Sequence, residues 1–181
     1  MEEKEFTLSI FTENKIGLLH RLTTIFTRRK INLDSINASE SEVKGVYRYT
    51  IVIHVTEDEV SKVVKQIEKQ IGVLKAFYHE KKDIVHQEIA LYKVPTQAFA
   101  NGTNVEMLIR KHNAHILNVE PEYIVIEKAG HKDETQQLFK ELEPLGVLQF
   151  VRSGRVAITK PMKKLTAYLR ELEIASEHTI K

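Results

Sequence analysis

The chain has 181 residues, 42% hydrophobic and 29% charged, which is typical of one medium or two small packed domains. Its 27 basic and 25 acidic side chains give a formal net charge of +2, and this near balance argues against a nucleic-acid-binding protein, which usually has a concentrated basic face. Cysteine is absent, which excludes disulfides and cysteine-ligated metal sites, and no apolar run approaches the roughly 18 residues of a membrane-spanning helix.

Hydrophobic periodicity in the first 80 residues predicts six elements in the order βαββαβ. They are a strand at 6–12, a helix carrying Leu19, Leu22 and Phe26, strands at 32–41 and 47–55, a helix opened by a capping box at 56–59, and a strand at 73–78. The stripe that the second helix is expected to bury consists of Val60, Val63, Val64, Ile67 and Ile71. Gly45 ends a predicted hairpin loop, and Gly72 is expected to end the second helix.

The same order returns in the second half of the chain after a charged segment at 79–83, which we interpret as a linker. The expected elements are a strand at 89–94, a loop at 95–103, a short helix with Val105, Leu108 and Ile109, strands at 115–119 and 123–127, a helix that begins near His131, and a strand at 147–151. A tail helix is expected from Pro161, with an apolar stripe of Met162, Leu165, Leu169 and Leu172.

These patterns predict an α+β fold of two tandem ferredoxin-like βαββαβ domains, at 5–79 and 86–160, followed by a tail at 161–181. A domain of roughly 75 residues buries a modest core and is marginally stable alone. Each open sheet also has edge strands that need cover. Pairing between chains is therefore expected, either edge to edge through the sheets or face to face through the helices.

The segment from Asn14 to Gly17 is the strongest candidate for a binding site. Gly17 stands where a helix begins, and the first amides of a helix lack intrahelical partners and carry a partial positive charge that can hold a carboxylate or a phosphate. Asn14 and Asn32 each add one acceptor and two donors. The corner suits a small zwitterion and has no nucleophile–base pair for chemistry. The residues alone equally allow a structural interpretation, in which Asn14 caps the helix and Gly17 eases a turn.

Other candidate sites have simpler explanations. His112 and His115 form the only close histidine pair, but they lie at a helix-to-strand junction where no regular helix would set both rings on one face, so a metal site is not expected. The acidic residues at 57–59 fit the first turn of a helix. Tyr47 and Tyr49 fit core packing better than an RNA-stacking platform. No nucleophile elbow, P-loop or dinucleotide-binding fingerprint occurs, and a small enzyme acting at the histidine junction is kept as an alternative.

Several motifs carry a resemblance to a known family. They are Leu8-Ser9-Ile10, Glu13-Asn14, Gly17-Leu18-Leu19, Arg21, Phe26, Arg28-Arg29, Asn32-Leu33-Asp34-Ser35, Arg48, Thr50-Ile51-Val52 and Gln66-Ile67-Glu68-Lys69-Gln70, followed by Glu88-Ile89, Leu91, Lys93-Val94 and Arg152-Ser153-Gly154. With these residues the chain resembles the small regulatory subunits of acetolactate synthase (acetohydroxyacid synthase), which begin with an ACT domain, a βαββαβ module that senses amino acids.

The acidic N-terminus does not have the pattern of a signal peptide, so a cytoplasmic protein is expected. The resemblance implies a non-catalytic regulatory chain in branched-chain amino acid (valine, leucine and isoleucine) biosynthesis. Such a chain activates the large catalytic subunit and confers feedback inhibition by a branched-chain amino acid, usually valine. Thiamine diphosphate, magnesium and FAD would belong to the large subunit, and no cofactor or metal to this chain. The ACT domains of two chains would form a homodimer with the effector at their interface, without nucleic acid or membrane partners. The alternative is a stand-alone ACT-type amino-acid sensor that regulates a different enzyme.

The effector-binding residues that the resemblance implies are Asn14, Ile16, Gly17, Leu18, Leu19, Asn32 and Leu33. The two asparagines would hold the α-amino and α-carboxylate groups, the amides at 17–19 would line the helix start, and Ile16, Leu18 and Leu33 would form an apolar wall. Lys30 and His20 depart from the family pattern. Lys30 stands where the family typically has Gly, and a positive φ there would cost on the order of 1 kcal/mol or more.

Overall fold

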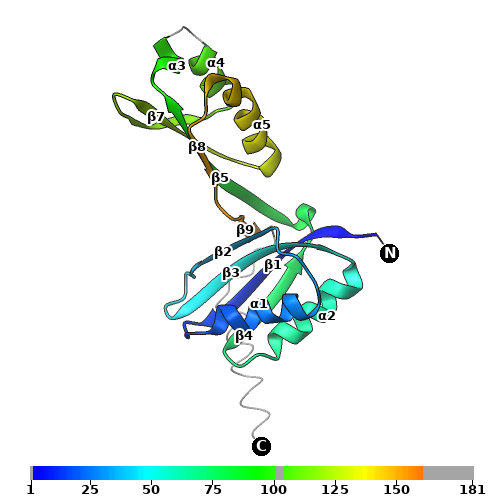
Figure 1. Ribbon diagram of the computed structural model, residues 1–181. Helices are drawn as coiled ribbons and strands as arrows, with labels where there is room; N and C mark the ends of the chain where they lie inside the picture. The colour runs from blue at the N-terminus through cyan, green and yellow to red at the C-terminus, as the bar shows by residue number, and fades with distance from the viewer. Residues whose placement is uncertain (1, 101–103, 161–181) are drawn as a thin grey trace, which may run out of the picture. The chain divides into compact units, whose positions relative to one another are not determined.

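The computed structural model describes residues 2–100 and 104–160 (Figure 1). The chain divides into two compact units. The first ends at Val85 and takes up the chain again from Ala157, and the second runs from His86 to Val156. From the sequence, the second domain is expected to extend to residue 160. The tail helix expected from Pro161 lies outside the described residues.

The first unit has the predicted βαββαβ order. Its elements are β1 (Lys4–Glu13), α1 (Leu18–Arg28), β2 (Ser35–Glu40), β3 (Val46–Val55), α2 (Glu57–Glu68) and β4 (Val73–His79), followed by the short 3₁₀-helix η1 (Lys81–Asp83). The strands form an antiparallel sheet in the order β2-β3-β1-β4, which places β2 and β4 at the edges. β2 begins three residues later than the sequence predicts, because the chain first crosses a turn after α1.

The core of the first unit lies between one face of this sheet and the two helices (Figure 1). Tyr49 is 7% exposed within it and Tyr47 packs against it, so the prediction that these tyrosines pack in a core is confirmed. The capping box is also confirmed, since the Thr56 hydroxyl accepts from the Glu59 amide. The prediction for Ile71 was wrong. Because α2 ends at Glu68, Ile71 lies in the following turn and is 82% exposed.

The second unit repeats the arrangement. Its elements are β5 (Ile84–Pro95), α3 (Gln97–Ala100), α4 (Asn104–Lys111), β6 (His115–Val119), β7 (Tyr123–Gly130), α5 (Lys132–Leu142), the 3₁₀-helix η2 (Glu143–Leu145) and β8 (Gln149–Arg152). The first two residues of β5 belong to the first unit, as does the last strand, β9 (Val156–Thr159), from Ala157 on. The antiparallel sheet has the order β6-β7-β5-β8, and β9 pairs with β5. The α+β fold with two βαββαβ-like units is therefore as predicted.

Three features of the second half were not predicted. The expected loop at 95–103 contains the single-turn helix α3, β5 begins five residues before the predicted strand, and β9 has no counterpart in the prediction. Within the two described ranges, no helix is long and apolar enough to cross a membrane.

Candidate functional site

The N-terminus of α1 is open, unlike that of α2. Gly17 occupies the N-cap position with φ 83°, no side chain caps the helix, and its first turn has no acidic residue. In α2, by contrast, Thr56 and Glu59 form a capping box and the first turn carries three acidic side chains. The first amides of α1 therefore keep their partial positive charge toward solvent. Asn14 does not cap α1, so the purely structural interpretation of Asn14 is not supported.

The space above Gly17 is empty. A Cβ built on this residue would meet no heavy atom within 4 Å. The left-handed backbone explains the glycine, because other residues adopt this conformation at a cost. Asn14 is exposed beside it and its amide donates to the Gly45 carbonyl at 3.2 Å, which fixes the loop between β1 and α1. Ile16 is fully exposed at the same corner. A ligand could approach this helix start without displacing a side chain.

Leu18 and Leu19 behave differently from each other. The Leu18 side chain is fully buried, with its Cδ1 atom 3.1 Å from the position that a Cβ on Gly72 would occupy, and its amide is used in a turn to Lys15. The expectation that the Leu18 side chain lines a ligand wall is therefore wrong, because helical spacing directs it into the core with Leu22. Leu19 is 44% exposed and remains available.

The turn after α2 lies at the same corner and was missed in the sequence analysis. The Arg21 guanidinium donates to the Ile71 carbonyl at 3.1 Å, and the Glu13 amide donates to the Gly72 carbonyl at 2.9 Å. Ile71 thus adds a third exposed apolar side chain near the α1 N-terminus, after Ile16 and Leu19. The sequence did not predict this exposed position, because the helical spacing of Ile71 assigns it to the buried stripe of α2.

Asn32 and Leu33 lie at the other end of the sheet. Asn32 is exposed in the turn between α1 and β2, and Leu33 is half-buried against the core. Ser35 at the start of β2 pairs with Val52, whereas Glu13, next to Asn14, pairs with Val46. Val46 and Val52 are six residue steps apart along β3, or about 20 Å at roughly 3.4 Å per step. One chain therefore does not bring Asn14 and Asn32 together around a small ligand.

Lys30, one of the two residues expected to depart from the family pattern, lies just after the end of α1. Lys30 has φ 57°, so the position does require the left-handed conformation. The Lys30 amide donates to the Thr27 carbonyl and the Ile31 amide to the Phe26 carbonyl, both at 3.0 Å, which is the hydrogen-bond pattern of a Schellman motif. His20 is exposed, and its carbonyl accepts hydrogen bonds from the hydroxyls of Thr23 and Thr24.

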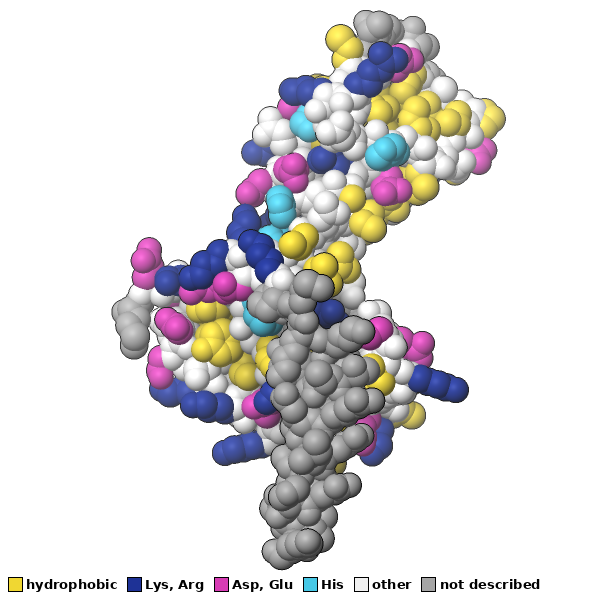
Figure 2. Space-filling model, turned by 180° about the vertical axis from the view of Figure 1, so that it is seen from behind, with side chains coloured by type: hydrophobic (Ala, Val, Ile, Leu, Met, Phe, Trp, Pro, Cys, Tyr) yellow, Lys and Arg dark blue, Asp and Glu magenta, His cyan; other side chains and the backbone are white. Residues whose placement is uncertain are grey.

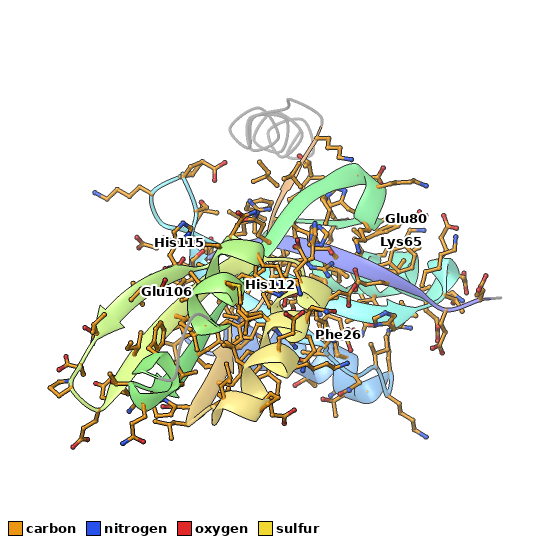
Figure 3. The ribbon with its side chains drawn as sticks, turned by 90° about the horizontal axis from the view of Figure 1, so that it is seen from above. Phe26, Lys65, Glu80, Glu106, His112 and His115 are labelled. Carbon is orange, nitrogen blue, oxygen red and sulfur yellow. The ribbon has the colours of Figure 1, made fainter. Side chains whose placement is uncertain are left out.

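At the histidine junction of the second unit, the two histidines have different surroundings. His112 follows α4, with its Nε2 atom 3.1 Å from the Glu141 carboxylate, whereas His115 is exposed on β6 (Figure 3). Hydrogen bonds from Lys111, and then from Gln137 and His112, lower the pKa of Glu141 to about 2. Among the residues that the structure describes, no group of three His, Cys, Asp or Glu could hold a metal ion.

Comparison with known protein families finds a match for each of the two units. The family model "AHAS small subunit-like ACT domain" matches residues 8–75, and the model "Small subunit of acetolactate synthase" matches residues 87–161. The acetolactate synthase small subunit of Bacillus subtilis is 33% identical over 154 residues, which cover 84% of this chain and 89% of that relative. The Mycobacterium bovis small subunit is 31% identical over 160 residues, covering 88% and 95%.

A solved structure agrees with these relatives. The crystal structure of the small subunit from Thermotoga maritima superposes with a TM-score of 0.80 at 25% identity, covering 88% of this chain and 99% of that one. The fold of the first unit and its match to the ACT-domain model define a regulatory protein of the ACT-domain class. More particularly, the chain belongs to the family of acetolactate synthase small subunits.

Proposed function

We propose that this chain binds the catalytic large subunit of acetolactate synthase, raises its activity and makes it sensitive to feedback inhibition by a branched-chain amino acid, with valine as the first choice. The chain itself performs no chemistry, and thiamine diphosphate, magnesium and FAD belong to the large subunit. Membership of the small-subunit family supports the partner. The observation that supports the effector site is the uncapped, open N-terminus of α1 at Gly17.

This corner has the chemistry of an amino-acid site. The α-carboxylate of the effector would accept from the free amides of the first turn of α1, where the helix dipole favours an anion. The exposed Asn14 side chain offers an acceptor to the α-ammonium group. Ile16 and Leu19, both exposed at this corner, are available to contact a branched aliphatic side chain. Burying these apolar groups against valine removes them from water.

The sheet register supports a site shared by two chains. β2 is an edge strand, and two copies related by a two-fold axis would pair their β2 strands antiparallel. Ser35 of one chain would then lie near Glu40 of the other. Glu40 pairs with Tyr47, at the end of the sheet where Asn14 lies. The dimer would thus bring Asn32 of one chain toward Asn14 and Gly17 of its partner, which a single chain does not do.

Inhibition then requires that the effector bind two states of the complex with different affinity. A coupling free energy of about 1–3 kcal/mol changes an equilibrium roughly 5- to 150-fold, which is sufficient for feedback control. Valine would supply this coupling by tightening the shared corner in one state of the dimer.

The test is reconstitution with the large subunit. We expect acetolactate formation to rise when this chain is added to the purified large subunit, and to fall again when valine is added. Leucine and isoleucine, tested in parallel, rank the effectors. An unchanged rate in every condition would contradict the proposed partner. That result would favour the alternative, a stand-alone ACT-type sensor of another enzyme, which would still bind an amino acid in calorimetry.

Two substitutions at Gly17 locate the site. Gly17→Asp puts a carboxylate into the open space above the helix start, where it would repel the effector's own carboxylate. Gly17→Asn has nearly the same size and backbone demands but no charge. We expect both variants to activate the large subunit, and the aspartate variant to lose valine inhibition by more than tenfold relative to the asparagine variant. Equal valine sensitivity in the two variants would place the effector elsewhere.

A further inference from the structure

The two α-helices that the structure describes for the first unit, α1 and α2, pack on the same face of its sheet. We call the opposite side the open face and define it by Ser9, Phe11, Arg48, Thr50, Val52 and Phe77. The strand register sets Ser9 opposite Thr50 and Phe11 opposite Arg48, so these side chains share one side of the sheet. The α-helices described for this unit, α1 and α2, pack on the other side.

Part of the open face is apolar. Phe11 and Val46 form a small buried cluster against Val43, Leu74 and Phe77, separate from the main core. The rings of Phe11 and Phe77 meet edge to face at 6.4 Å. Figure 2 shows hydrophobic side chains gathered on this unit when it is viewed from behind. A sheet face with buried aromatic side chains needs an apolar cover.

The same face contains polar atoms that lack hydrogen-bond partners. Arg48 Nε, His79 Nε2 and Ser35 Oγ are buried and form no hydrogen bond within the described structure. Burial is the main cause that lowers the pKa of both Arg48 and His79. Arg48 forms no ion pair with any carboxylate of the described residues. Its guanidinium lies over the ring of Phe11, 5.4 Å from the ring centre. Buried donors without acceptors are costly, so the cover should bring oxygen acceptors as well as apolar groups.

The chain returns to this face just before the described residues end. Arg48 Nη2 donates to the Ala157 carbonyl at 2.5 Å and to the Ser9 hydroxyl at 3.3 Å. The Lys160 amide donates to the Asp83 carbonyl at 3.0 Å. Residue 161 therefore follows directly from a segment that is fixed to the first unit, beside its open face.

The 21 residues at 161–181 have the length and composition of such a cover. A helix of this length would span about 30 Å, comparable with the roughly 33 Å of a ten-residue strand such as β1. Its apolar residues at helical spacing are Met162, Leu165, Leu169 and Leu172, and its carboxylates are Glu171, Glu173 and Glu177. The family model of the second unit ends at residue 161, so residues 162–181 lie beyond both family models.

We propose that the open face is the docking site for residues 161–181 of the same chain. The apolar stripe covers the Phe11 cluster, and a tail oxygen accepts from Arg48. A covalently attached segment that begins beside its site has a high effective concentration, which favours it over a second molecule. The proposal does not depend on the proposed function, because it concerns only how this chain covers its own sheet.

The absence of cysteine allows a direct cross-linking test. We expect the pair Thr50→Cys and Leu169→Cys to form a disulfide within one chain under mild oxidation, so that a monomer loses both reactive thiols and runs faster on a non-reducing gel. The matched control replaces Leu169→Cys by Ala167→Cys, about 160° away from it around a helix of 3.6 residues per turn. A second control joins Leu169→Cys with Lys62→Cys on the exposed side of α2.

The cross-linking results distinguish docking of the chain's own residues 161–181 from docking of a second copy of the chain. Disulfide-linked dimers would show that another copy supplies the cover, and cross-linking at the same rate in all three pairs, or in none, would also overturn the proposal. Because Thr50→Cys could disturb folding, a chain ended after Lys160 provides a second measurement. We expect it to bind more of an apolar fluorescent dye and to unfold at a lower temperature than the full chain. Equal dye binding by the two chains would contradict the docking.

Discussion

Two residues at opposite ends of α1 adopt the left-handed backbone conformation, for different reasons. Gly17 adopts φ 83° at the helix start, where the absence of a side chain leaves the first amides open. Lys30 adopts φ 57° after the helix end, where the Schellman hydrogen bonds require that conformation of whatever residue is present. The first residue is suited to binding, whereas the second is a strained exception to the family pattern.

The strain at Lys30 can be measured. We expect Lys30→Gly to raise the free energy of unfolding by about 1 kcal/mol, because glycine adopts a positive φ without steric cost. Urea denaturation followed by circular dichroism measures the change. Arg29→Gly is the matched control: Arg29 has φ −91°, so glycine there should give no gain or a loss. A stability gain in the control alone would contradict this account of the strain.

The sequence predicted a helix or strand correctly where the residues that indicate it all lie within that one element. The capping box of α2 involves residues three apart, and the buried stripe from Val60 to Ile67 follows one helix face. The prediction that Ile71 is buried was wrong because hydrophobic periodicity does not show where a helix ends. The strand β9 was missed because four residues give too little alternation, and its partner β5 lies more than 60 residues earlier. A short strand depends on pairing that only the folded sheet supplies.

The packing of α5 on β5 gives a prediction about alkaline pH. The Tyr92 hydroxyl donates to the Thr135 carbonyl at 2.7 Å, and burial raises the pKa of Tyr92 from 10 to about 12. A raised pKa in the folded state means that the stability from neutral Tyr92 is fully present below pH 10 and is lost as pH rises through 12.

Comparison with Tyr92→Phe isolates this effect. At pH 8 the variant should be less stable by about 1 kcal/mol, because it lacks the hydrogen bond. Between pH 10 and pH 12 the parent should lose stability faster than the variant, so the difference narrows or reverses. Urea titrations at several pH values measure both curves. Parallel curves across this interval would show that Tyr92 does not ionise with a raised pKa.

At the scale of the whole molecule, the separation of Asn14 from Asn32 is the main consequence of the fold. The register places them about 20 Å apart along the sheet of one chain. A site that uses both asparagines therefore needs two chains. Edge pairing through β2 is the arrangement that we propose for the dimer.

Mixing two variants tests the shared site. Asn14→Ala and Asn32→Ala, each alone, should lose valine inhibition while still activating the large subunit. In a mixed dimer, one site combines both substitutions, but the other combines the intact Asn14 of one chain with the intact Asn32 of its partner. Co-expression should therefore restore part of the valine inhibition. No recovery in isolated mixed dimers would contradict a site shared between chains.

The sequence by itself determined the α+β class, the repeated βαββαβ order and the position of Gly17 at a helix start, because these depend on neighbours within a few residues. Only the tertiary structure decided that Leu18 is buried, that Ile71 lies at the candidate site, and that Asn14 and Asn32 occupy opposite ends of one sheet. The physical reason is that strand register and helix ends are set by contacts between segments distant in sequence, which no local periodicity contains.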